Sequence, residues 1–169
     1  PDLQERLRKD VLALPGEPEA RAEALAELAP LRAFAQEAMR IFPPIPILSR
    51  RVLADDVIDG WRIRAGNTML LSMIGLHHDR TIYPDPARID LGRHPAGRTP
   101  RALAAHFLPF GDGQRICPGS RFANAELLTA LATFLQRVRI RPAGSSTLAF
   151  RWDASLRRAQ GNHLRLDAL

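Results

Sequence analysis

Cysteine, lysine and aromatic residues are all scarce in this sequence. Of 169 residues, one is a cysteine (Cys117), one is a lysine (Lys9), and 6% are aromatic. A single cysteine excludes an internal disulfide and any metal site built from several cysteines. No apolar run approaches the roughly 20 residues that cross a bilayer, and no signal-peptide pattern opens the chain. We therefore expect no membrane segment and a cytoplasmic location.

Positive charge is in excess and comes almost entirely from arginine. The formal net charge is +6. The arginines are scattered, and no basic run alternates with aromatic residues, so we do not expect a nucleic-acid partner. An acidic protein partner fits the charge better, and a plain solvated surface is the simplest interpretation.

The pattern of apolar residues predicts helices first and short strands later. Helical spacing predicts helices over 2–14, 17–27 and 30–41, the last stopped by Pro43-Pro44. Short strands separated by Asp-Gly and Gly-Asn turns are predicted between 50 and 73. Residues 75–109 read as mostly irregular, a helix continues to about 138, and the tail reads as strands. This order indicates a single α+β domain rather than alternating βαβ units.

The only cysteine lies in a glycine-rich loop, FGDGQRICPG, directly before the helical run that starts near Ser120. Pro118 suits the first turn of a helix, where unpaired N–H groups and the helix dipole stabilise a thiolate. Such a thiolate serves as a nucleophile, binds a metal, or is buried and inert. A nucleophile needs an oriented base, and only His106 lies near in sequence. The glycines and Arg115 favour a ligand, and a single axial thiolate on haem iron requires no second cysteine.

This loop resembles the haem-binding loop of the cytochrome P450 family. Its fixed positions are all present, as Phe110, Gly113, Arg115, Cys117 and Gly119. The resemblance implies that Cys117 is the axial ligand of haem b (iron protoporphyrin IX). It also implies that the haem contacts a set of residues around that ligand: Phe110, Gly111, Arg115, Ile116, Gly119 and, as a second propionate partner, Arg50. A surface arginine is the alternative interpretation of Arg50.

A second family signature, Glu-x-x-Arg before a proline-rich turn, is matched by Glu37 and Arg40 in EAMRIFPP. At i and i+3 these residues share a helix face, and without the resemblance an exposed surface pair is the simpler interpretation. The family implies a buried pair, locked by an arginine that follows. Arg93 is the expected partner and Arg88 the alternative, although the usual Pro-Glu-Arg-Phe motif is replaced by residues 91–94, LGRH.

The resemblance extends over the whole chain in family order. It implies that residues 1–169 are the C-terminal, proximal part of a single cytochrome P450 domain, without the N-terminal part that carries the distal oxygen-binding helix. The expected substrate pocket is formed by Ile45, Ile47, Leu48, Ala154 and Ser155, of which Ile45 and Leu48 also suit a plain core. The tandem His77-His78 followed by Asp79 suggests a metal site, but adjacent residues on a strand face opposite ways.

The function implied by the resemblance is that of a haem-thiolate monooxygenase of the bacterial soluble type. The complete enzyme would hydroxylate or epoxidise a small apolar organic substrate with O₂. Its electrons would come from NAD(P)H through a ferredoxin, flavodoxin or reductase, docked at a basic face near Arg121. We expect this segment alone to be inactive. Two alternatives are a truncated, non-catalytic haem-binding or structural fragment and an enzyme with a cysteine nucleophile.

Overall fold

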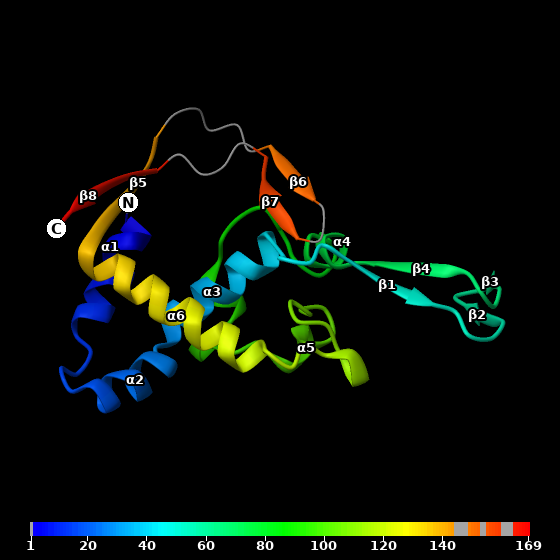
Figure 1. Ribbon diagram of the computed structural model, residues 1–169, viewed down its shortest axis with the longest axis horizontal. Helices are drawn as coiled ribbons and strands as arrows, with labels where there is room; N and C mark the ends of the chain where they lie inside the picture. Colours follow the sequence, from blue (N-terminus) through cyan, green and yellow to red (C-terminus); the bar gives the residue numbers. More distant parts are fainter. Residues whose placement is uncertain (1, 144–148, 153–154, 160–163) are drawn as a thin grey trace.

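The computed structural model describes residues 2–143, 149–152, 155–159 and 164–169, and Figure 1 shows its helices and small sheets. Helices dominate the first part of the chain and strands the last part, as expected for an α+β fold. The elements in chain order are α1 (Asp2–Leu12), α2 (Pro18–Ala26), α3 (Ala29–Ile41), β1 (Ile47–Arg51), β2 (Asp56–Ile58), β3 (Trp61–Ile63), β4 (Thr68–Ser72), α4 (Met73–His77), the 3₁₀ turns η1 (Leu91–Arg93) and η2 (Pro95–Gly97), α5 (Arg101–Ala104), the 3₁₀ turn η3 (Gly113–Arg115), α6 (Ser120–Arg137), β5 (Val138–Pro142), β6 (Phe150–Trp152), β7 (Leu156–Arg158) and β8 (Leu164–Ala168).

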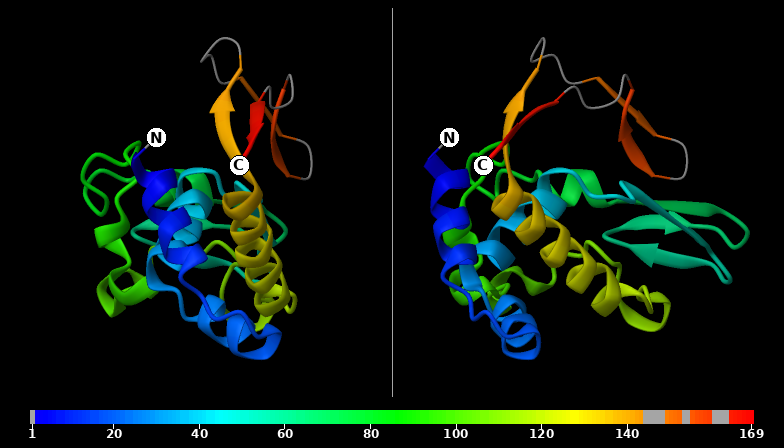
Figure 2. Two further views of the ribbon diagram at one scale, coloured as in Figure 1. Left: turned by 90° about the vertical axis from the view of Figure 1, so that its left-hand side faces the viewer. Right: turned by 60° about the vertical axis from the view of Figure 1, so that its left-hand side comes forward.

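The main apolar core lies between α1, α3 and α6. Leu7 and Val11 of α1 stand one turn apart and are buried, because side chains at i and i+4 share a helix face. They meet Leu31 of α3 and Leu128 of α6 in one buried cluster. In Figures 1 and 2, α1 runs beside the C-terminal half of α6. This core fixes α3, which carries Glu37 and Arg40.

The strands in the described part of the chain form four antiparallel pairs. β1 pairs with β4 from Ile47 opposite Ser72 to Arg51 opposite Thr68, and β2 pairs with β3 beyond them. These two hairpins form an arm that projects away from the helices (Figure 1). The arm carries strongly exposed apolar side chains, among them Trp61 and Leu70. β5 pairs with β8, and β6 with β7.

The segment expected to be mostly irregular, 75–109, contains several short helical turns. These are the end of α4, then η1, η2 and α5. Tyr83, His77 and His94 from this segment are fully buried, with exposures of 0%, 0% and 1%. The segment therefore packs as a core element even though its backbone is largely without regular structure. Among the described residues, no helix is long and apolar enough to span a membrane.

Candidate functional site: the Cys117 loop and the network behind it

Cys117 lies in the turn between η3 and α6, and its side chain is exposed. The expectation that Pro118 occupies the first turn of the helix is wrong. The helix begins at Ser120 with Gly119 as its N-cap residue, since the first i→i+4 bond runs from Ala123 N to Gly119 O at 2.9 Å. Cys117 therefore precedes the helix by three residues.

Backbone hydrogen bonds close the loop around the cysteine. Cys117 N–H donates to Phe110 O at 2.9 Å, and Ile116 N–H donates to Gly113 O at 3.1 Å. Gly111 and Gly113 have φ values of 74° and 68°, a conformation that favours glycine over residues with a Cβ. The glycines noticed in the sequence are thus required by the backbone path that presents the thiol.

The thiol of Cys117 faces a cavity of about 290 Å³. Most of its wall is apolar, and Arg115 supplies a cation. Six residues predicted from the sequence line this cavity: Ile45, Leu48, Phe110, Gly111, Arg115 and Cys117; its remaining lining residues are Pro44, Met73, Leu108 and Pro109. These features fit haem b. The exposed sulfur suits the iron, the apolar wall suits the porphyrin face, and the guanidinium of Arg115 suits a propionate.

Other predicted residues lie near this cavity without lining it. Arg50 and Leu48 are two residues apart on β1 and so share a face, whereas Ile47 points to the opposite face. Arg50 Nη1 donates to the neighbouring Ser49 carbonyl at 2.9 Å. Of these residues, Arg50 is therefore on the side of the strand that faces the loop, and Ile47 is not.

Ile116 and Gly119 lie on the loop but outside the cavity. Ile116 is 52% exposed and borders a second hollow, together with Phe107 and Ser120. A Cβ built at Gly119 would stand 3.8 Å from the Cys117 sulfur, an ordinary contact distance. Phe110 borders both hollows, so the loop forms a wall between them.

The C-terminal hairpin reaches the same region through its backbone. Leu156 N–H donates to the carbonyl of Pro44, one of the cavity-lining residues, at 2.8 Å. The rings of Phe150 and Phe42 lie 5.4 Å apart. Ser155, predicted to line the substrate pocket, is therefore next to a residue bonded to the cavity wall. Ala154 lies outside the described residues.

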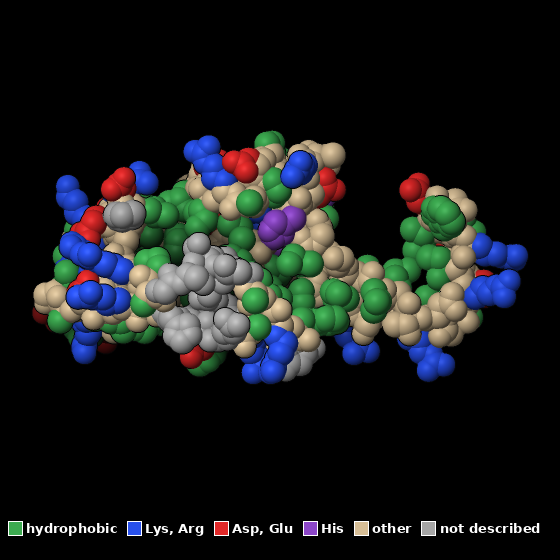
Figure 3. Space-filling view, turned by 90° about the horizontal axis from the view of Figure 1, so that it is seen from above, with side chains coloured by type: hydrophobic (Ala, Val, Ile, Leu, Met, Phe, Trp, Pro, Cys, Tyr) green, Lys and Arg blue, Asp and Glu red, His purple; other side chains and the backbone are tan. Residues whose placement is uncertain are grey.

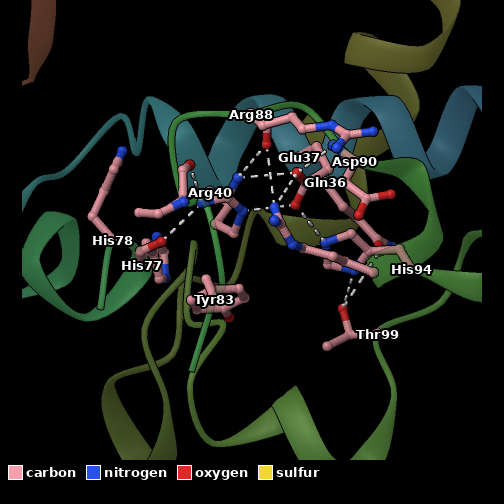
Figure 4. Close-up of polar contacts among 12 residues, drawn as sticks. Gln36, Glu37, Arg40, His77, His78, Tyr83, Arg88, Asp90, His94 and Thr99 are labelled. Atoms are coloured by element: carbon pink, nitrogen blue, oxygen red, sulfur yellow. Dashed lines mark hydrogen bonds and ion pairs between the residues drawn. The ribbon is translucent and has the colours of Figure 1, made fainter. Parts of the chain in front are cut away.

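Behind the loop, Glu37 and Arg40 form a fully buried ion pair on α3 (Figure 4). Arg40 Nε donates to Glu37 Oε1 at 2.7 Å, and its Nη2 donates to Oε2 at 3.0 Å. Arg93 Nη1 donates to the same Oε2 at 3.3 Å, and the Asp90 N–H does so at 2.9 Å. The structure thus brings Glu37, Arg40 and Arg93 together. Arg88 contributes its carbonyl, which accepts from Arg40 at 3.2 Å.

The environment of Glu37 holds its carboxyl group in the ionised form. Burial on its own raises the pKa of Glu37. Contacts with His94 and Arg40, the Asp90 N–H and the charge of Arg40 outweigh burial and lower this pKa to about 2. The carboxylate is therefore charged throughout the physiological range and can hold both arginines.

His94, which stands where the family pattern has phenylalanine, belongs to the network, and the sequence did not reveal this. Its Nε2 lies 3.3 Å from Glu37 Oε1 but is not aligned for a hydrogen bond. Its Nδ1 lies 3.2 Å from Thr99 Oγ1, and Thr99 in turn donates to Gln36 Oε1 at 3.4 Å. The one indication in the sequence was that residue 94 is histidine where the family motif has phenylalanine.

The tandem histidines have separate partners. His77 ends a short helix, α4, and His78 is its C-cap residue, so the strand geometry assumed in arguing that the two histidines face apart does not apply. His77 Nε2 accepts from Leu108 N–H at 3.0 Å, and His78 Nδ1 contacts the Ile74 carbonyl at 2.9 Å. In the described part of the chain, no group of three or more His, Cys, Asp or Glu residues is placed to hold a metal ion.

Arginine and lysine side chains are spread over the face seen in Figure 3 and do not merge into one patch on its described part. Arg121, the residue expected to mark a docking face, is exposed in the first turn of α6. It lies four residues after Cys117 in the sequence.

The family is established by comparison with known proteins. An exposed loop thiol on an apolar cavity, backed by a buried Glu-Arg-Arg network, is the arrangement expected of a haem-thiolate protein. The family profile described as Cytochrome P450 matches residues 1–163, and the chain therefore belongs to the cytochrome P450 family. Homologues in this family are monooxygenases. The expected α+β fold, a portion of the cytochrome P450 fold, is confirmed.

Several relatives show how much of the family this chain represents. Putative cytochrome P450 132 of Mycobacterium tuberculosis is 42% identical over 115 residues, which cover 68% of this chain and 25% of that protein. Human cytochrome P450 4F2 is 36% identical over 146 residues, which cover 84% of this chain and 28% of that protein. The crystal structure of a cytochrome P450DA mutant heme domain matches with a TM-score of 0.87 at 26% identity, covering 100% of this chain and 39% of that one. The chain spans little more than a quarter of the length of these two curated relatives.

Proposed function

We propose that this chain supplies the proximal side of the active site of a haem-thiolate monooxygenase, with Cys117 as the axial ligand of haem b. The observation that carries the proposal is the exposed Cys117 thiol on an apolar cavity that also holds Arg115. When bound, the haem supplies the redox chemistry by which one atom of O₂ enters a C–H or C=C bond, the other leaving as water.

The residues of this chain act by binding and orientation. Cys117 would hold the haem iron through its thiolate, and the electron density of this sulfur would support the oxygen chemistry that the haem supplies. Leu48 and Leu108, which line the cavity, would present apolar groups to the porphyrin, and Arg115 would neutralise a propionate. Arg50, on the same face of β1 as Leu48, is the second candidate for a propionate. Ile45 faces the same space and is our candidate for contact with an apolar substrate.

The electron donor follows from the family and the charge of the chain. We propose that electrons derived from NAD(P)H arrive through an acidic ferredoxin, a flavodoxin or a reductase that docks near Arg121. The net charge of +6 supports an acidic partner because opposite charges steer association. The assignment of residues 1–169 to the C-terminal part of one domain, the cytoplasmic location and the inactivity of the isolated segment stay predictions.

The proposal is tested by the spectrum of the haem-loaded protein, in its full natural length. Thiolate ligation gives the reduced, CO-bound form a Soret band strongly shifted to the red. We expect this band in the wild type and its loss in Cys117→Ser. Ser120→Ala, a substitution three residues away at the start of α6, is the control and should retain the band. A wild type that takes up no hemin would instead favour a non-catalytic structural fragment.

A further inference from the structure

Two buried side chains that the proposed function does not use hold the backbone just before the Cys117 loop. His77 Nε2 accepts the Leu108 N–H at 3.0 Å. The Tyr83 hydroxyl donates to the His106 carbonyl at 2.9 Å. Both side chains are 0% exposed. Two points of one short segment are thus held from inside the protein.

Both residues also contact Arg40, His77 through its backbone carbonyl and Tyr83 through its ring (Figure 4). Arg40 Nη1 donates to the His77 carbonyl at 2.9 Å. Its guanidinium carbon lies 5.1 Å from the centre of the Tyr83 ring, within the range of a cation–π contact. The Glu37–Arg40 pair is therefore connected to the segment 106–108 through two separate residues, by the backbone and ring of His77 and by the side chain of Tyr83.

The held segment is continuous with the cysteine loop. The Leu108 carbonyl accepts the Gly111 N–H at 3.1 Å, and the Phe110 carbonyl accepts the Cys117 N–H at 2.9 Å. Leu108 also lines the cavity that the thiol faces. A shift of Leu108 would therefore be passed on to the cysteine through two backbone hydrogen bonds.

The chemistry of His77 argues that its acceptor nitrogen is what matters. A ring that accepts at Nε2 is neutral and carries its proton on Nδ1, and burial together with the charge of Arg40 lowers the pKa of His77 to about 4. Within the described chain Nδ1 has no hydrogen-bond partner. An unpaired buried N–H is costly, so for packing alone an apolar ring would serve better beside Phe107. The bond to Leu108 compensates for that cost.

We propose that His77, assisted by Tyr83, is a positioning residue for the Cys117 ligand. By holding Leu108 and His106, these two side chains would fix the position of the loop backbone that carries the Cys117 sulfur. The inference rests on the proposed function. It predicts that thiolate ligation of the haem depends on a hydrogen-bond acceptor for the Leu108 N–H at residue 77. A ring that only fills the space should not be enough.

The test compares His77→Phe, which keeps a ring but has no acceptor, with His77→Gln, whose Oε1 lies as many bonds from Cβ as Nε2 does. Two quantities are measured in the full-length protein: hydrogen exchange of the Leu108 amide, and the fraction of haem that gives the thiolate-type CO band. We expect His77→Phe to speed exchange about tenfold, as the loss of one hydrogen bond implies, and to lower the thiolate-type fraction. His77→Gln should restore both, and Tyr83→Phe should lower the fraction less.

His78→Gln is the matched control, since the contact of His78 stays within its own helix. It should leave both quantities unchanged. Should His77→Phe not fold, His77→Asn makes the same comparison, because its amide is one methylene too short to reach Leu108. A thiolate-type band in the wild type that is kept in full by the variants that cannot accept the Leu108 N–H overturns the positioning role alone. A wild type that binds hemin without such a band overturns the ligand assignment and this role with it.

Discussion

Arg40 and Glu37 form a two-point ion pair in which neither side chain reaches solvent. Arg93 and the Asp90 amide both donate to Oε2 of Glu37 as well. Because α3 supplies the pair and the segment after α4 supplies the other donors, one carboxylate joins two distant parts of the sequence. A buried charge of this kind is stable only while its partners are present.

Glu37→Gln should therefore strongly destabilise the protein. The variant leaves two buried or half-buried guanidinium groups without their anion, and removing one partner of a buried pair costs about 3–5 kcal/mol. The free energy of unfolding is measured by urea denaturation.

Glu27→Gln is the control for this substitution. Glu27 pairs with Arg32 at 2.9 Å, but its side chain is 67% exposed. Exposed pairs contribute about 0–1 kcal/mol, so this variant should stay close to the wild type. Equal losses in the free energy of unfolding of Glu37→Gln and Glu27→Gln would contradict a special role for the buried pair.

Stability should fall with acidification in two successive steps. The pKa of His77 is lowered from 6.5 to about 4, so between these values the unfolded chain binds a proton that the native chain refuses. The pKa of Glu37 is lowered from 4.5 to about 2, which gives a second loss between those values. Both contributions are complete above pH 6.5 and decline as the pH falls.

Urea denaturation at a series of pH values checks this prediction. Each step should be of the order of 3 kcal/mol, from 1.36 kcal/mol per unit of pKa. His77→Gln should flatten the step between pH 6.5 and 4 and leave the lower step in place. A stability that stays constant down to pH 4 in the wild type would show that His77 does not remain neutral in the folded protein.

Gly113→Ala should cost about 1–2 kcal/mol through backbone strain alone. Its φ is 68°, and no atom lies within 4 Å of the position where a Cβ would stand. The cost therefore comes from the left-handed conformation and not from a clash. Gly16→Ala is the control, since Gly16 also has open space but no positive φ. It should be neutral or slightly stabilising in thermal unfolding; a neutral Gly113→Ala would refute the strain argument.

The contact between His94 and Thr99 should appear as a coupling of about 0.5–1.5 kcal/mol in a double-mutant cycle. The two side chains lie 3.2 Å apart, and His94 is fully buried. Thr99→Val should therefore destabilise the wild type more than it destabilises His94→Phe. Strictly additive losses in urea unfolding would mean that the two side chains act independently.

Leu31→Ala should remove about 2–5 kcal/mol of stability, because Leu31 is 0% exposed in the core between α1, α3 and α6. Leu53→Ala, at a leucine that is 89% exposed, deletes the same atoms from a solvated site and should change little. Calorimetric unfolding of both variants makes the comparison.

The sequence predicted the regular elements well because their signals are local. Helical spacing of Leu7 and Val11 predicted α1, and the proline pair after Ile41 predicted the end of α3. The predictions that failed concerned the backbone conformation of a few residues at the ends of helices. Pro118 lies before α6 and not in its first turn, and His77, in a segment predicted to be mostly irregular, ends a short helix. Side chains such as His94 were missed because their partners lie far away in the sequence or outside the usual motif.

The sequence by itself determined which residues carry chemistry: one cysteine in a glycine loop, and a Glu-x-x-Arg pair before a proline turn. Those signals are short, and a turn or a helix face can be inferred from a few neighbours. Only the tertiary structure decided that His77 holds Leu108, that His94 meets Glu37, and that Leu48 faces Cys117 across a cavity. These contacts depend on how separate elements pack, and burial gives each of them its strength by removing the competing water.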